Sequence, residues 1–183
     1  IVHAFDINTG ESISKFKRKK TKKIKLIPVF SIICFFLICL SGYFFISNNR
    51  NGEIMNEKIL FNSIFSLNKI AVVGMSAKTN RPSYQIGFYL KEQGYDIYPV
   101  NPNYNKIDEL KCFSNLNEIR DSIDIINIFR HPDHVLPIVN DSIKINPKVI
   151  WFQDGVVNYE AIDLAKKNGI KTIVDDCIYR RHK

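Results

Sequence analysis

Short apolar runs alternate with helical patterns along residues 55–183. Each run is rich in Ile and Val and is bounded by Gly, Pro, Asn or Asp, as buried parallel strands commonly are. Strands that alternate with helices in this way predict a parallel α/β sheet. The five expected strands are Lys69–Gly74, Asp96–Val100, Asp124–Arg130, Lys148–Gln153 and Lys171–Asp175.

The segments between these runs predict three helices. The first covers Pro82–Gly94, with Pro in its first turn and Gly as its stop. The second extends over residues 131–146, where Pro137 falls early enough to be tolerated near the first turn. The third begins at Asn158, a residue type that favours the N-cap position, and continues to Asn168.

Two stretches fit this pattern less simply. Pro99 interrupts the second strand, and because Pro has no N–H to donate, it predicts a strand end or an irregular edge. Residues 104–119 carry mixed signals, and we expect a short strand around Cys112 followed by a helical turn.

The N-terminal segment has a different character. Eight Lys and Arg residues within 15–25 precede an uncharged apolar stretch over residues 26–46. That stretch is long enough, at about 1.5 Å per helical residue, to cross a hydrocarbon layer of about 30 Å. It therefore predicts a membrane-spanning helix, with a buried core helix as the alternative. The basic residues ahead of it predict a cytoplasmic N-terminus.

This contrast predicts two parts, residues 1–54 and residues 55–183. Met55 opens a segment that would serve as the first helix of a free-standing domain. We therefore consider two hypotheses for residues 1–54: a genuine anchor, or an over-extended reading frame. The protein is expected to be cytoplasmic if translation starts at Met55, and otherwise to be anchored by a single membrane span.

The charge and the cysteines exclude several classes of function. Residues 1–54 contain nine Lys or Arg against three Asp or Glu, so most of the formal net charge of +8 lies there. The remaining part is almost neutral, and we expect no nucleic-acid partner. Cys112 and Cys177 form no CxxC pair, which indicates neither a disulfide framework nor a zinc site. His131 and His134 are expected at the surface rather than on a metal, since no third ligand is evident.

Ligands of open α/β sheets bind outside the carboxyl ends of the strands. After the first strand, Gly74 permits a tight turn, Lys78 and Arg81 supply positive charge, and a helix N-terminus follows. This loop predicts a phosphate site, with a plain strand-to-helix turn as the alternative. It matches neither GxGxxG nor the P-loop. Val100-Asn101-Pro102 stands where a dinucleotide fold would place an acidic residue, which argues against NAD.

The remaining strand ends carry further candidate residues. Phe129 and Arg130 follow the third strand, Gln153 ends the fourth, and Cys177 follows the last. Each has an ordinary alternative: aromatic side chains such as Phe129 and Trp151 are often core residues, and a cysteine can be a small buried apolar group.

Taken together, these motifs resemble a known family. They occur in the order and spacing of small CoA-binding proteins related to the N-terminal CoA-binding domain of the succinyl-CoA synthetase α-subunit. The resemblance covers about residues 56–180. The motifs are Val73-Gly74-x-Ser76 with Arg81-Pro82-Ser83, Tyr98–Pro102, Asp124–Arg130, Trp151–Val156 and Asp176–Ile178.

The resemblance implies a Rossmann-like fold, a parallel sheet with helices on both faces, that holds CoA across the strand ends. The glycine-led loop should contact the CoA phosphates through Gly74, Ser76, Lys78, Arg81 and Ser83. The nucleotide should be bordered by Val100, Asn101 and Pro102. The cleft should be lined by Phe129 and Arg130, with Gln153 and Cys177 nearby.

The expected function is therefore binding of coenzyme A or an acyl-CoA, without catalysis of the protein's own. Three alternatives stay open: a CoA-linked enzyme that uses Cys177 in thiol or acyl transfer, an NAD(P)-binding Rossmann protein, and an anchored interaction protein. The oligomeric state is left open, and a membrane partner is possible only through residues 26–46.

Overall fold

The computed structural model describes residues 53–183. The predicted membrane-spanning stretch, residues 26–46, lies outside the described residues. Within 53–183, no helix is both long enough and apolar enough to cross a membrane. The two hypotheses for residues 1–54 therefore stay predictions.

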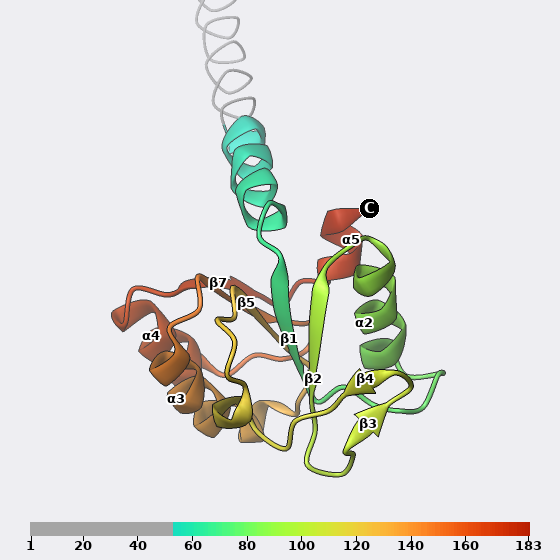
Figure 1. Ribbon diagram of the computed structural model, residues 1–183. Coiled ribbons are helices and arrows are strands. Elements are labelled where there is room, and N and C mark those ends of the chain that lie inside the picture. The colour runs from blue at the N-terminus through green and yellow to red at the C-terminus, as the bar shows by residue number, and fades with distance from the viewer. Residues whose placement is uncertain (1–52) are drawn as a thin grey trace, which may run out of the picture. The chain divides into compact units, whose positions relative to one another are not determined.

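The centre of the described part is a five-stranded parallel sheet with the strand order β2-β1-β5-β6-β7 (Figure 1). All five predicted strands are confirmed, each within a residue or two of its expected ends. Every residue of β5 and β6 is buried, which explains why these strands read as unbroken apolar runs. The strands are β1 (Lys69–Val73), β2 (Asp96–Val100), β5 (Ile125–Ile128), β6 (Val149–Phe152) and β7 (Lys171–Val174).

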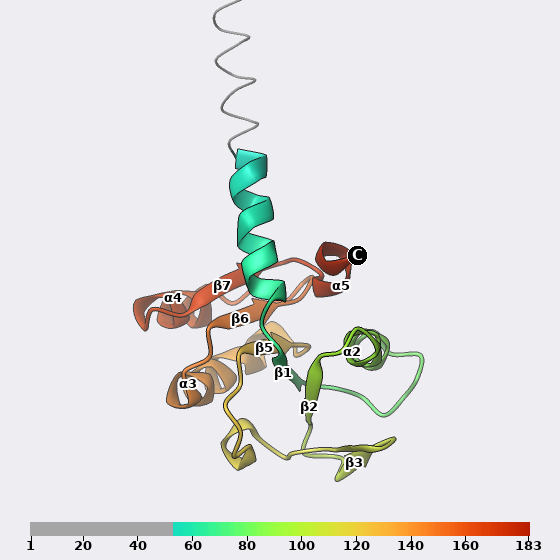
Figure 2. The ribbon, with the colours of Figure 1, turned by 45° about the horizontal axis from the view of Figure 1, so that its top comes forward.

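Helices cover both faces of the sheet, as predicted (Figure 2). One face packs against α3 and α4 through Val135, Val139 and Ala165. The opposite face packs against α2 and α5 through Leu90 and Ile178. The helices are α2 (Pro82–Glu92), α3 (Val135–Ile145), α4 (Tyr159–Lys167) and α5 (Ile178–His182).

The chain reverses its direction of travel across the sheet at β1. From β1 it crosses to β2 on one side, and later it returns to β5 on the other side of β1. The connection from β1 runs through α2 on one face, whereas the connection from β5 runs through α3 on the other. The two loops therefore part at the carboxyl ends of β1 and β5, which is the position where open α/β sheets form their binding crevice.

The helix ends follow the sequence signals with one difference. Pro82 is at the first position of α2, and the Asn158 Oδ1 atom accepts a hydrogen bond from the Ala161 N–H at 2.9 Å at the start of α4. The helix predicted over residues 131–146 is α-helical only from Val135. Its first turn, Pro132–His134, is a 3₁₀ helix.

The two uncertain stretches are now defined. β2 is an edge strand of the sheet, so Pro99 removes no inner hydrogen bond, and its carbonyl accepts the Phe113 N–H at 2.9 Å. Residues 104–119 contain a small antiparallel hairpin, β3 (Lys106–Ile107) with β4 (Leu110–Lys111), and the 3₁₀ turn η1 (Leu116–Glu118). The expected strand therefore ends one residue before Cys112, and its partner strand β3 was not predicted.

A helix over residues 53–65 leads into β1. Its last two turns pack on Trp151, whose ring centroid lies 5.8 Å from that of Phe61 and 5.9 Å from that of Phe65. Ile64 on the same helix is 2% exposed, whereas Ile59 is 60% exposed. The end of this helix nearest β1 is therefore part of the domain core.

Replacing Ile64 by Ala should lower the free energy of unfolding by about 2 to 5 kcal/mol, because it removes buried methylenes and leaves a cavity. The matched substitution Ile59→Ala should change it by no more than about 0.5 kcal/mol. Urea denaturation of the full chain, followed by the fluorescence of its single tryptophan, gives both values. Equal effects would mean that this helix is not docked on the sheet.

Candidate functional site

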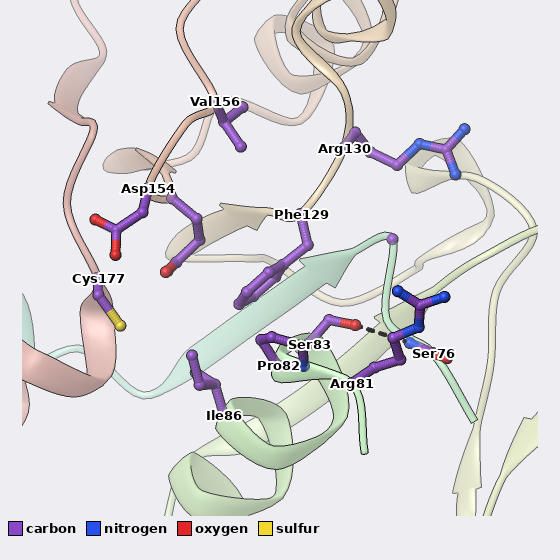
Figure 3. Close-up of a pocket in the computed structure, with 12 residues that line it drawn as sticks. Ser76, Arg81, Pro82, Ser83, Ile86, Phe129, Arg130, Asp154, Val156 and Cys177 are labelled. Atoms are coloured by element: carbon purple, nitrogen blue, oxygen red, sulfur yellow. Dashed lines mark hydrogen bonds between the residues drawn. The ribbon is translucent and has the colours of Figure 1, made fainter. Parts of the chain in front are cut away.

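A pocket of about 520 Å³ lies at the carboxyl ends of the strands (Figure 3). Its walls come from the loops that follow β1, β5, β6 and β7 and from the first turns of α2. It lies on the crevice that the reversal at β1 creates. The lining residues are Gly74, Ser76, Arg81, Pro82, Ser83, Ile86, Phe129, Arg130, Gln153, Asp154, Val156 and Cys177.

Gly74 is required where β1 ends because two backbones meet there. Its φ is +86°, and a Cβ atom added to it would lie 2.3 Å from the Phe129 carbonyl oxygen and 2.8 Å from the Arg130 Cδ atom. The Gly74 N–H donates to the Val100 carbonyl at 2.8 Å. A glycine therefore allows the loops after β1, β2 and β5 to approach one another.

The loop after Gly74 is tied to the first turn of α2. The Ser83 hydroxyl oxygen accepts from the Ser76 N–H, and the Ser76 hydroxyl oxygen accepts from the Lys78 N–H, each at 3.1 Å. The first turn of α2 contains no Asp or Glu, and Arg81 immediately precedes it. The positive end of the helix dipole and the Arg81 guanidinium thus act together on an anion at this end of the pocket.

A smaller pocket of about 150 Å³ lies next to the first one. Gly74 and Arg130 line both pockets, so they form the partition between them. The smaller pocket is also lined by Val100, Pro102 and residues 114–116, which form the start of η1 and the residues just before it. Arg130 therefore lies between Val100 and Pro102, which were predicted to border the nucleotide, and the loop after Gly74, which was predicted to bind the phosphates.

Two predicted site residues lie away from both pockets. The Asn101 side chain is buried, donates to the Met75 carbonyl at 2.8 Å and accepts from the Asn103 N–H at 3.1 Å. Asn101 therefore holds the loop after β1 in place. Lys78 is exposed on the same loop and lines neither pocket.

The floor of the main pocket contains a buried amide. Gln153 is 4% exposed, and its Nε2 atom donates to the Asn127 Oδ1 atom at 2.6 Å. Asn127 is fully buried in β5, and among residues 53–183 its Nδ2 atom has no hydrogen-bond partner. This pair fixes the orientation of the Gln153 side chain and gives an otherwise apolar floor one polar contact.

The main pocket is polarised from end to end. Figure 3 shows Arg81 and Arg130 at one end and Cys177 and Ile86 at the other, with the Phe129 ring between them. The site therefore offers positive charge to an anion at one end, and at the other end a thiol and Ile86 with the Asp154 carboxylate beside them.

The wall at the thiol end is held by ion pairs. Arg180 donates to both carboxylate oxygens of Asp154, at 3.1 and 2.9 Å, and to Asp176 at 2.9 Å. These hydrogen bonds hold the pKa of Asp154 below its ordinary value. Arg180 thereby joins the loop after β6 to the loop after β7 and neutralises the acidic side chain at the pocket rim.

Cys177 follows directly on this clamped loop. The Asp175 Oδ1 atom accepts from the Gly155 N–H at 2.8 Å, and the Trp151 indole N–H donates to the Asp176 carbonyl at 2.7 Å. Cys177 is half-buried, whereas Cys112 is buried and its pKa is raised by that burial. Of these two thiols, Cys177 is the one that lines the pocket.

Four lining residues were not among the predicted site residues: Pro82, Ile86, Asp154 and Val156. Asp154 and Val156 flank Gly155 in the turn after β6, close to the predicted Gln153, so their place in a strand-end loop was the available signal. Ile86 lies on α2, and its inward orientation follows from how the helix packs on the sheet.

Comparison with known proteins identifies relatives of this chain. Residues 68–183 match the family model described as a CoA binding domain. The chain is 36% identical over 114 residues to the uncharacterized protein YneT of Bacillus subtilis, covering 62% of this chain and 84% of that protein. A hypothetical protein from Pyrococcus horikoshii superimposes with a TM-score of 0.64 at 36% identity, covering 65% of this chain and 84% of that one.

A further relative is much longer than the matched segment. The chain is 38% identical over 78 residues to acetate–CoA ligase (ADP-forming) II of Archaeoglobus fulgidus, which is 42% of this chain but 11% of the ligase. The shared segment is thus one small part of that enzyme.

Replacing Gly74 by Ala should destabilise the fold more than replacing Gly94 by Ala. Both glycines have positive φ, but a Cβ at Gly94 meets nothing within 4 Å. Gly94→Ala should therefore cost only the backbone strain, about 1 to 2 kcal/mol. Gly74→Ala adds a steric clash and should cost about 1 to 3 kcal/mol more. Urea denaturation of both variants measures the difference, and equal losses would refute the close approach to Phe129.

Replacing Arg180 by Gln should raise the pKa of Asp154 toward its ordinary value, because the charge-assisted hydrogen bonds are lost. The pKa of an unfolded-state Asp is about 4, and the pKa of Asp154 in the folded protein is lower. Above about pH 4 this difference stabilises the folded protein, and the stabilisation is lost as the pH falls through the pKa of the folded state. The difference in unfolding free energy between native chain and variant should therefore shrink from about pH 6 to about pH 3.

An NMR titration of the Asp154 carboxyl carbon measures this shift. The control is Lys167→Gln, which removes the comparable surface pair of Lys167 with Asp163 on α4 and should leave Asp154 unchanged. An Asp154 titration that is the same with and without Arg180 would show that the clamp is absent in solution.

Proposed function

This chain belongs to the CoA-binding domain family, and from that premise we propose that it binds coenzyme A or an acyl-CoA in the main pocket and its smaller neighbour. The observation that carries this proposal is the polarity of the main pocket. Coenzyme A is itself polarised, with a phosphorylated nucleotide at one end and a thiol at the other. The ligand and the pocket therefore match in only one direction.

The diphosphate of the ligand belongs beside Arg81 and Arg130. A guanidinium binds phosphate oxygens through paired N–H donors and keeps its charge at any physiological pH. The N-terminus of α2 adds its dipole at the same place. The tight turn at Gly74 brings the loop after β1 against Phe129 and Arg130, so the Arg130 side chain lies beside this loop.

The adenosine part of the ligand fits the smaller pocket. Val100 and Pro102 provide apolar surface for a base, and Ser114 and Asn115 in the same pocket provide polar groups. Because Arg130 lines both pockets, it lies where the ligand passes from nucleotide to pantetheine. Asn101 supports this region through the Met75 carbonyl and needs no direct ligand contact.

The pantetheine arm then lies along Phe129 and Val156, toward Cys177. Its amides can hydrogen-bond with Gln153, the buried polar side chain on the pocket floor. Asp154 does not repel the anionic ligand strongly, because Arg180 neutralises it. Binding, rather than catalysis by Cys177, is the function proposed.

Isothermal titration of the full chain in mild detergent with CoA, dephospho-CoA and NAD tests this proposal. CoA should bind and NAD should not. Dephospho-CoA should bind more weakly, by about tenfold, if the exposed Lys78 reaches the 3′-phosphate, since a hydrogen bond to a charged group is worth about 1.5 to 3 kcal/mol. Arg130→Gln should weaken CoA binding by about tenfold or more for the same reason.

The matched control is Lys167→Gln, which removes one positive charge from α4 outside both pockets and should leave CoA affinity unchanged. The proposal is wrong if NAD binds in preference to CoA, or if Arg130→Gln has no effect. Equal affinity for CoA and dephospho-CoA would remove only the role of Lys78.

A further inference from the structure

A separate hollow of about 380 Å³ lies next to the main pocket. We call this hollow the side groove, and it is lined by Pro82, Gln85, Ile86 and Tyr179. Pro82 and Ile86 line the main pocket as well, so the two spaces are neighbours across these side chains. The side groove therefore borders the main pocket along the first turns of α2.

The walls of the side groove are formed by the first turns of α2 and by α5, which lie side by side in both views (Figures 1 and 2). The Tyr179 ring packs edge-on against Tyr89 of α2, with ring centroids 4.6 Å apart and planes at 77°. The Tyr89 hydroxyl is also 3.0 Å from the Nδ1 atom of His182. These contacts hold the aromatic wall of the groove in place.

The chemistry of the groove suits an uncharged guest. Its four lining side chains are a proline, an isoleucine, a tyrosine and a glutamine, and none of them carries a charge. Ile86 is half-buried and also lines the main pocket. An aliphatic chain would cover this surface without burying an unpaired charged group.

The position of the groove connects it to the ligand's sulfur. Cys177 and Ile86 mark the end of the main pocket opposite the arginines (Figure 3), and Tyr179 lies two residues after Cys177. In the binding direction proposed above, the CoA sulfur reaches this end. A group attached to that sulfur must continue beyond this end, and the side groove adjoins the main pocket there at Ile86.

We propose that the side groove holds the acyl group of an acyl-CoA. The protein should therefore bind thioesters with an uncharged aliphatic tail more tightly than free CoA. This inference rests on the proposed function, since it needs the CoA part to lie in the main pocket. It specifies the ligand class further: the tail is aliphatic, and it contacts Ile86 and Tyr179.

Titration of the full chain with CoA, acetyl-CoA, butyryl-CoA and hexanoyl-CoA tests the inference. Full burial of a methylene strengthens binding about fourfold, and a groove open on one side should give about half of that free energy, or about twofold for each methylene. Hexanoyl-CoA should therefore bind about an order of magnitude more tightly than acetyl-CoA.

Two variants locate the effect. Tyr179→Ala removes the aromatic wall and should bring the affinity ratio of hexanoyl-CoA to acetyl-CoA down by about three- to fivefold. Gln85→Leu makes the groove more apolar and should raise the same ratio. Tyr159→Ala is the matched control, because Tyr159 is 81% exposed on α4 and is not part of the groove, so it should leave the ratio unchanged.

The outcomes separate the two proposals. If CoA and all its thioesters fail to bind, the proposed function is wrong. If CoA binds and all thioesters bind equally well, the side groove holds no acyl chain and the proposed function stands. If Tyr179→Ala does not fold, Gln85→Leu decides, and an unchanged ratio in that variant overturns the inference.

Discussion

The contact between the end of β1 and the end of β5 is the constraint on which the site depends. At Gly74 the chain turns against the Phe129 carbonyl with no room for a Cβ atom, and the Phe129 N–H donates to the Val73 carbonyl at 2.8 Å. The Gly74 N–H binds the Val100 carbonyl, so three neighbouring strands are joined at one edge. From this edge α2 leaves on one face and α3 on the other, and the crevice between the departing loops becomes the pocket.

The fold was largely predictable because parallel strands buried on both faces read as unbroken Ile and Val runs. The parts that were missed lack such a signal. The hairpin of β3 and β4 has two residues in each strand, too few to show an alternation. The helix α5 ends in Arg180, Arg181 and His182. Its contacts come from ion pairs with Asp176, from Ile178 and from edge-on packing of Tyr179 and His182 on Tyr89, rather than from an apolar stripe.

The candidate site was predictable where residues lie in loops at strand ends, since topology alone brings those loops together. Arg81, Arg130 and Cys177 come from three separate loops, and all three line the main pocket. The sequence could not reveal that the Asn101 side chain donates its hydrogen bond to the Met75 carbonyl. A structural amide and a ligand-binding amide look the same in a motif. Nor could it reveal Ile86, whose orientation depends on the packing of α2.

Both proposals depend on one orientation of the ligand, with its phosphates beside Arg81 and Arg130 and its sulfur beside Cys177. A crystal structure of the chain with CoA measures this directly. We expect diphosphate density at the Gly74 turn and the CoA sulfur at the Cys177 end of the pocket. A reversed ligand, with sulfur at the arginines, or a pocket left empty at saturating CoA, would contradict it.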